Sequence, residues 1–283
     1  MTDAEGSRYV ASGSVAQLAR AWLDAGGPPG VPTRRASTVM VLRRAEPDGA
    51  AGTGVEVFMQ RRVATMAFAA SMWVFPGGGV DPRDADADMP WAGPSPDEWA
   101  TRMNVPRPEA IELVCAAVRE VFEECGVLLA GPEGQELLAD VAGPGWQRHR
   151  DALIAKEVSL SQLLARERLV LRSDLLSLQD HWVTPEFEPK RYDTYFFAAL
   201  LPHGQTADDL TTEADLSCWV RPADLLADLA ADRARMLAPT SWNLERLGRA
   251  DTPAQVIGAA PAIGPIMPVA AYHGEDVVVR WAT

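Results

Sequence analysis

Residues 119–127 read REVFEECGV and hold three glutamates, Glu120, Glu123 and Glu124, at positions i, i+3 and i+4. On a helix that turns about 100° per residue, these carboxylates lie on one side, one turn apart. Apolar residues recur on roughly the opposite side, so the helix can pack on a core while it presents three like charges. Gly126 predicts the end of this helix.

Three adjacent carboxylates repel one another, and a divalent cation removes that repulsion. Mg²⁺ and Mn²⁺ take oxygen ligands and are held by a few carboxylates together with substrate phosphates. The alternative for the glutamates alone is a solvated acidic face of a surface helix. The sequence upstream favours the cation site, because residues 74–79 read VFPGGG. This pattern predicts a strand that runs into a glycine-rich turn, where backbone can approach a ligand closely.

The two segments together resemble the Nudix box of the Nudix hydrolases, G-x5-E-x7-R-E-U-x-E-E-x-G-U, with U aliphatic. The second half matches position for position. Gly78 and Arg119 are 41 positions apart, against 14 in the family, so 27 extra residues split the box. The first glutamate of the pattern falls on Asp84 when counted forward and on Ile111 when counted back, with Glu112 adjacent but out of register. The fourth acidic position is therefore left open.

The resemblance implies an α/β fold, the Nudix α/β/α sandwich with a mixed β-sheet, here with added helical insertions. It also implies metal-dependent hydrolysis of a nucleoside diphosphate linked to another moiety. The implied ligands of Mg²⁺ or Mn²⁺ are Glu120, Glu123, Glu124 and a backbone carbonyl at Gly77 or Gly78. Arg119 would orient a glutamate through a charge-assisted hydrogen bond, and one of the three glutamates or Glu213 would act as the base.

A loop acid before a tryptophan-bearing strand often binds metal or serves as base in this family. Glu213 is the position that matches, with Asp215 as a competitor and an exposed loop acid as the alternative. Arg61 and Arg62 end a predicted strand, where they either capture phosphate or remain solvated.

Phe68 and three glycines complete the predicted substrate site. Phe68, together with Met66 and Met72, either forms the floor of a substrate pocket or packs in the core. The glycines at 77–79 (Gly77, Gly78 and Gly79) would leave room for a pyrophosphate.

A looser resemblance points to the Nudix subgroup that has a long insertion in the box and includes a peroxisomal coenzyme A diphosphatase. It is carried by FPGGG, a DTYFF strand at 193–197, and a late PT-initiated helix. Coenzyme A or an acyl-CoA is the implied substrate. The alternatives are an ADP-ribose, NADH or nucleotide pyrophosphatase, or a catalytically silent Nudix-fold nucleotide-binding protein. The final residues are Trp281-Ala282-Thr283 and no peroxisomal tripeptide, so we expect no peroxisomal import.

Composition restricts the partners. The 283-residue chain has a net charge of −13, which argues against nucleic acid or anionic membranes as partners held by bulk charge. We find no signal-peptide pattern and no apolar run of about 18 residues. The three cysteines, Cys115, Cys125 and Cys218, show no zinc spacing. We therefore expect a cytoplasmic protein that acts on a small nucleotide-type molecule, with a homodimer as an open option.

The chain is predicted to divide into an N-terminal segment with a short helix (1–32), a Nudix domain (33–250) and a tail with short strands (251–283). The domain carries an insertion at 82–108 within the box and a helical insertion at 131–181. The expected helices cover 15–25, 96–103, 108–125, 135–141, 146–156, 159–178, a stretch from 221 and one from 239 capped by Thr240. The expected strands cover 36–44, 54–62, 182–185, 192–201, 218–220, 266–269 and 277–281, and the first two form a hairpin around a loop at 46–53.

Overall fold

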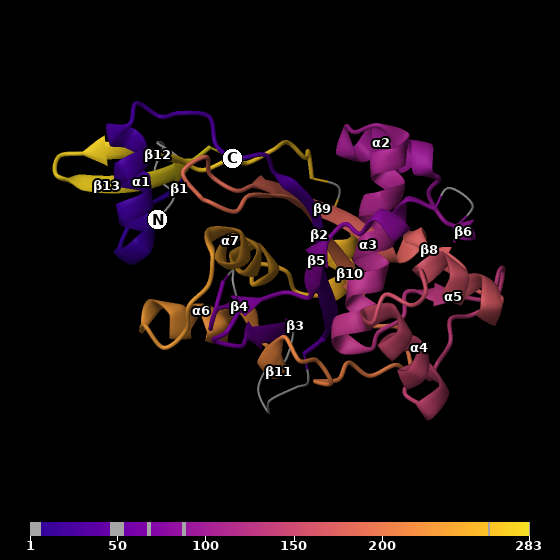
Figure 1. The fold of residues 1–283 in the computed structure, drawn as a ribbon. Helices are drawn as coiled ribbons and strands as arrows, with labels where there is room; N and C mark the ends of the chain where they lie inside the picture. The colour runs from indigo at the N-terminus through magenta and orange to yellow at the C-terminus, as the bar shows by residue number, and fades with distance from the viewer. Residues whose placement is uncertain (1–6, 46–53, 67–68, 87–88, 260, 283) are drawn as a thin grey trace.

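In the computed structural model, which describes residues 7–45, 54–66, 69–86, 89–259 and 261–282, a mixed seven-stranded sheet forms the centre (Figure 1). The order is β11 (Ala214–Val220), β3 (Val55–Arg62), β2 (Arg34–Arg44), β10 (Tyr192–Leu200) and β9 (Leu176–Val183). In addition, β4 (Trp73–Val74) pairs with β3, and β5 (Gly77–Gly79) pairs with β2. β2 and β10 run parallel, whereas the other pairs are antiparallel.

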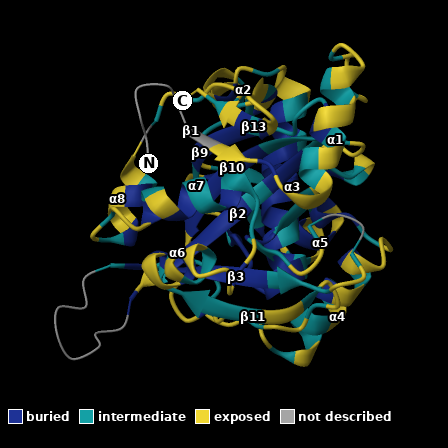
Figure 2. Ribbon diagram, turned by 90° about the vertical axis from the view of Figure 1, so that its left-hand side faces the viewer, coloured by how far each residue is buried: buried dark blue, intermediate teal, exposed yellow. Residues whose placement is uncertain are grey.

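The central strands are apolar on both faces because helices cover both faces. Val39 and Val41 of β2 belong to the core under α3 (Arg107–Cys125). Met40 and Leu42 belong to the core under α6 (Pro222–Ala230) and α7 (Ala238–Leu247). Figure 2 shows β2 and β3 largely in the colour of buried residues, whereas β11 at the edge of the sheet is in the intermediate colour. The predicted α/β/α sandwich with a mixed sheet is confirmed, as is the hairpin of β2 and β3, although its loop at 46–53 lies outside the described residues.

The residues that split the box pack onto the domain. The predicted insertion at 82–108 begins too early, because η1 (Pro82–Ala85) holds Asp84, which bonds Arg119 of the box. The residues after η1 form β6 (Trp91–Ala92) and α2 (Pro96–Met103), which begins with a capping box at Ser95. Trp99 of α2 is fully buried and meets Phe197 of β10 edge-on, with 5.8 Å between ring centroids. The insertion is therefore anchored in the core of the domain.

The second insertion contains less helix than predicted. It has α4 (Pro144–Ile154) and α5 (Leu160–Glu167), together with β7 (Ala130–Gly131), β8 (Val170–Arg172) and η2 (Ser173–Leu175). No helix forms at 135–141, where Gln205 donates a hydrogen bond of 3.0 Å to the Leu138 carbonyl. The predicted helical run 159–178 ends at Arg168, which caps α5 in the left-handed conformation, and β8 then joins a small sheet with β6 and β7.

Two further local predictions are wrong. α7 begins at Ala238 with Leu237 as its N-cap, so Thr240 lies inside the first turn and does not cap the helix. The tail strand expected at 266–269 instead forms over β12 (Val269–His273), because Ile266 makes an isolated parallel bridge to Trp182 of β9. In the described part of the chain, no helix is both long and apolar enough to cross a bilayer.

The two ends of the chain fold together. β1 (Ser7–Val10), β13 (Asp276–Trp281) and β12 form an antiparallel sheet in that order, and α1 (Gly13–Asp24) packs on it around its own buried cluster. We call these four elements the terminal lobe. α8 (Pro253–Gly258) precedes its C-terminal part. In Figure 1 the lobe lies on the side of the central sheet that carries α7, away from α3.

Candidate active site

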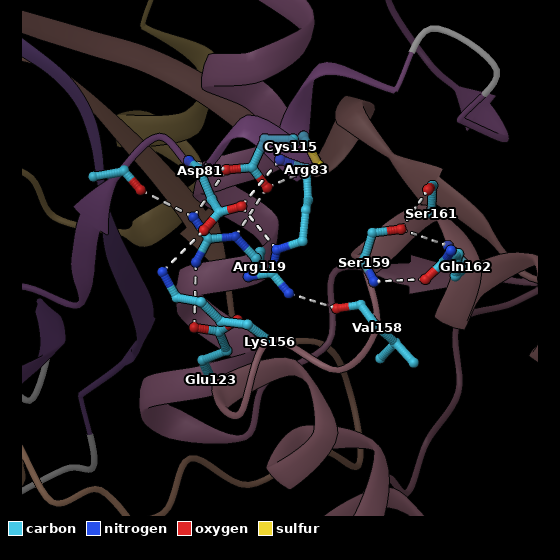
Figure 3. A network of polar contacts seen from close by, with 12 residues as sticks. Asp81, Arg83, Cys115, Arg119, Glu123, Lys156, Val158, Ser159, Ser161 and Gln162 are labelled. Carbon is cyan, nitrogen blue, oxygen red and sulfur yellow. Dashed lines mark hydrogen bonds and ion pairs between the residues drawn. The ribbon is translucent and has the colours of Figure 1, made fainter.

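Arg119 of α3 is the centre of a buried network of acids. Its Nη1 donates to Glu120 Oε1 at 2.7 Å and to Glu123 Oε2 at 3.2 Å. Its Nε and Nη2 each donate to a carboxylate oxygen of Asp84 at 2.9 Å, and Nη2 also donates to the Gly79 carbonyl at 3.0 Å. Figure 3 shows Arg119 among these contacts, with Glu123 on one side of the guanidinium. Charge-assisted bonds of this kind fix both partners, so Arg119 orients two of the three glutamates.

The structure identifies which residue occupies the fourth acidic position. Asp84, in η1, is 1% exposed and forms a two-pronged ion pair with Arg119. Ile111 is a core residue, and Glu112 pairs with Arg35 at 2.6 Å. Counting forward from Gly78 therefore gives the acid that pairs with Arg119, because the extra residues enter the chain after Asp84.

The glycine run is a strand and not the predicted turn. β5 pairs with β2, and the Gly77 amide donates to Glu124 Oε2 at 2.9 Å. A Cβ on Gly78 would lie 2.5 Å from Glu120 Oε1, and one on Gly77 would lie 2.5 Å from the Ser37 carbonyl oxygen. Glycine at positions 77 and 78 therefore lets this strand fit between β2 and the carboxylates of α3.

The glutamates are held in an environment that resists their negative charge. Burial raises the pKa of Glu120 to about 7, although Arg119 opposes the shift. Burial, followed by the charge of Glu120, raises the pKa of Glu124 well above its usual range, and burial also raises the pKa of Glu123. Burial therefore disfavours the charged forms of these acids, and a bound cation would favour them again.

The donor set fits a hard divalent cation in its chemistry. All three side chains offer carboxylate oxygens, and Glu123 Oε1 is buried without a hydrogen-bond partner. As the side chains stand, no three His, Cys, Asp or Glu groups in the described residues form a ready-made ion site, since Arg119 engages Glu120 and Glu123. The unpartnered oxygen and the buried carboxylates are what a bound cation would satisfy.

A cavity of about 430 Å³ opens beside this network. Glu120 and Glu124 line it together with all three glycines of β5, whereas Glu123 does not. Arg62, at the end of β3, also lines it and donates from Nη2 to Glu213 Oε2 at 3.2 Å. Arg62 Nε is buried and has no partner. A cation, an acid and the carboxylate cluster therefore face one space.

The remaining predicted residues are placed differently. Arg61 donates to Asp215 Oδ1 at 2.8 Å and is not part of the cavity lining, so its predicted role finds no geometric support. Phe68 lies outside the described residues. Met66 lines the cavity.

Sequence reasoning missed one whole wall of this cavity. Its lining residues come from β9, the loop that follows it and the terminal lobe: Tyr9, Val15, Trp182, Phe187, Glu188 and Pro268. No local motif marks these positions. Tyr9 reaches the cavity through the pairing of β1 with β13, and Trp182 through the pairing of β9 with β10.

The family model described as the NUDT19 Nudix domain matches residues 94–247. The chain is 27% identical over 193 residues to the putative nudix hydrolase 7 of Caenorhabditis elegans, covering 68% of this chain and 56% of the relative. It is 27% identical over 237 residues to the acyl-coenzyme A diphosphatase NUDT19 of Gallus gallus, covering 68% of this chain and 61% of the relative. The aligned part thus spans less than two thirds of the length of these curated relatives.

A solved structure agrees with these matches. The crystal structure of a NUDIX hydrolase from Alicyclobacillus acidocaldarius superposes with a TM-score of 0.66 at 26% identity, covering 83% of this chain and 99% of that one. The family model covers more than half of the chain and includes α3 with its arginine and glutamates. The chain belongs to the Nudix hydrolase family.

Proposed function

We propose that this chain hydrolyses the pyrophosphate bond of a nucleoside diphosphate linked to another moiety, with coenzyme A or an acyl-CoA as the substrate. The observation that carries the proposal is the convergence of Glu120 and Glu124 with Arg62 on one cavity, while Arg119 holds Glu120 and Glu123 in place. The choice of coenzyme A derivatives rests on the similarity to two relatives, from Gallus gallus and Xenopus laevis, that are both named acyl-coenzyme A diphosphatase NUDT19.

Nudix hydrolases generally use divalent metal ions, and Glu120, Glu123 and Glu124 are the residues that would hold Mg²⁺ or Mn²⁺ here. Such an ion would neutralise phosphate charge and lower the pKa of a bound water. The backbone of β5, with no side chains, leaves room for a pyrophosphate beside Glu120.

The chain's own residues supply the remaining functions. Arg62 has an unpartnered buried Nε that would donate to a phosphate oxygen and so orient the reacting bond. Glu213 has a half-exposed carboxylate on the cavity and would accept the proton of the attacking water at Oε1 or Oε2. The pair between Arg62 and Glu213 would keep both groups pointed at the same substrate.

The test uses Glu123→Gln, which removes one charge with little change in shape. We expect metal-dependent turnover to fall about 10²- to 10³-fold, the scale of losing one preorganised charge-stabilising group, while the protein stays folded. Glu109→Gln is the matched control, because Glu109 lies on the same helix and pairs with Arg35 away from the cavity.

Substrates are coenzyme A, octanoyl-CoA, ADP-ribose and NADH, each with Mg²⁺ and with Mn²⁺, and products are identified by mass. Unchanged turnover in Glu123→Gln would refute the site. Binding of these compounds without cleavage would favour a silent nucleotide-binding protein.

A further inference from the structure

The terminal lobe lies outside the segment that matches the family model, yet it is part of the cavity wall. Tyr9 of β1, Val15 of α1 and Pro268, just before β12, line the same cavity as Glu120 and Glu124. The lobe has a buried cluster of its own, which includes Phe187 from the loop between β9 and β10. The chain therefore builds a second wall for its active site from segments at both of its ends.

This second wall is aromatic and held rigidly. The Trp182 indole Nε1 donates to Asp180 Oδ2 at 2.8 Å, and Asn243 Nδ2 donates to the same oxygen at 3.3 Å. The Trp182 ring meets the edge of Trp281 in β13, with 5.5 Å between centroids, and Trp281 lies 6.2 Å from Tyr9. These edge-on and tilted ring contacts present a largely apolar surface to whatever enters the cavity.

Charge distinguishes this wall from the catalytic end. Of the described residues that line the cavity, only Arg62 is cationic, and it is paired with Glu213 beside the carboxylates. The wall formed by the lobe, Trp182 and Phe187 carries no described cation, and the acid Glu188 lines the cavity beside Phe187. A phosphate placed there would lose its hydration without a compensating positive charge, so this wall suits an uncharged group.

We propose that the terminal lobe, together with Trp182 and Phe187, forms a subsite for the uncharged, largely apolar arm of the substrate. This is the moiety on the far side of the pyrophosphate from the charged nucleotide, an acyl-pantetheine arm in an acyl-CoA. The assignment rests on the proposed function. A cavity of about 430 Å³ that joins the carboxylates to this wall is within the usual range for a site of this kind.

The experiment compares kcat/KM for coenzyme A, octanoyl-CoA and ADP-ribose in the wild-type protein with Mg²⁺. Burial of several chain methylenes predicts a preference of about tenfold or more for octanoyl-CoA over coenzyme A, expressed mainly in KM. In Tyr9→Ala the octanoyl-CoA to coenzyme A ratio should fall by at least about threefold, because the wall loses a ring. Val15→Asp should reduce the ratio further by placing a charge in the wall.

Tyr272→Ala is the matched control, since Tyr272 is a similarly exposed tyrosine on β12 of the lobe that does not line the cavity. Circular dichroism and thermal melting establish that each variant is folded, and Tyr9→Ala decides the outcome if Val15→Asp is unfolded. The subsite is overturned if the octanoyl-CoA to coenzyme A ratio is the same in Tyr9→Ala as in Tyr272→Ala, or if the wild-type protein prefers ADP-ribose. In either case, hydrolysis that still requires Glu123 leaves the proposed function intact. Absence of any hydrolysis that requires Glu123 overturns both.

Discussion

Helix α3 and the terminal lobe line the same cavity, but opposite kinds of interaction hold them there. α3 presents buried charges that Arg119 fixes through ion pairs to Asp84, Glu120 and Glu123. The lobe presents apolar and aromatic surface and is held mainly by packing. Buried charges require matched partners in fixed positions, whereas an apolar wall tolerates many residues of similar volume. The catalytic end is therefore expected to be intolerant of substitution, and the lobe is where substrate preference can change.

The largest expected loss of stability comes from replacing Arg119 on α3. Arg119→Leu should destabilise the protein by about 3–5 kcal/mol, because Asp84 and Glu120 would remain buried without their cation. Urea unfolding followed by circular dichroism measures this change. Arg233→Leu serves as the control and should cost less than about 1 kcal/mol, since Arg233 pairs with Asp228 on the surface. Similar costs for the two variants would contradict a network held by buried ion pairs.

A single methyl group in β5 tests how closely the catalytic end is fitted. In Gly78→Ala the new Cβ would meet the Glu120 carboxylate at 2.5 Å and displace it. A shift of the carboxylate by about 1 Å predicts a loss in kcat of about a hundredfold. Gly79→Ala is the matched control, because its Cβ would have no neighbour nearer than 3.9 Å, so turnover should stay close to wild type. Equal activity of the two variants would show that the position of Glu120 is not critical.

The sequence predicted α3 and its charges well because the information there is local. Three glutamates at helical spacing, an apolar opposite face and Gly126, which ends α3 in the left-handed conformation, all lie within one segment. Asp84 could be found by counting forward from Gly78, because the extra residues enter after it, but nothing in the sequence alone ruled out the count back to Ile111.

Elements that depend on distant partners were predicted less well. The terminal lobe depends on the pairing of β1 with β13, from opposite ends of the chain. Residues 135–141 form no helix, and the side chain of Gln205, far along the chain, bonds the backbone there at Leu138. The three glycines form a strand only because β2 offers an edge to pair with. In each of these places tertiary contact overrides local preference.

Arg191 ties the segments beside the lobe to the domain, and removing its side chain should loosen the lobe more than the central sheet. Arg191 is buried and donates to the carbonyls of Thr184 at 3.0 Å and Val31 at 2.9 Å, and to Met267 Sδ at 3.4 Å. Arg191→Ala should cost about 1–3 kcal/mol, the scale of losing such bonds. Amide hydrogen exchange should become faster in β12, β13 and α1 but remain slow in α3. Lys190→Ala, at the exposed neighbouring position, should leave exchange unchanged, and faster exchange in α3 would show that the two walls are not independent.

The smallest expected effect separates two adjacent arginines at the end of β3. Arg62→Ala should raise KM about tenfold, because a charge-assisted bond to phosphate is worth about 1.5 kcal/mol or more. Arg61→Ala should change KM less than about twofold, because Arg61 forms only an exposed pair with Asp215. Steady-state kinetics with octanoyl-CoA measures both. A larger effect of Arg61→Ala would mean that phosphate binds on the side of β3 where Arg61 pairs with Asp215. It would contradict the assignment of the catalytic end to the cavity that Arg62 lines. If only Arg62→Ala weakens binding, the cation that lines the cavity is the one that the substrate meets, next to the carboxylates of α3.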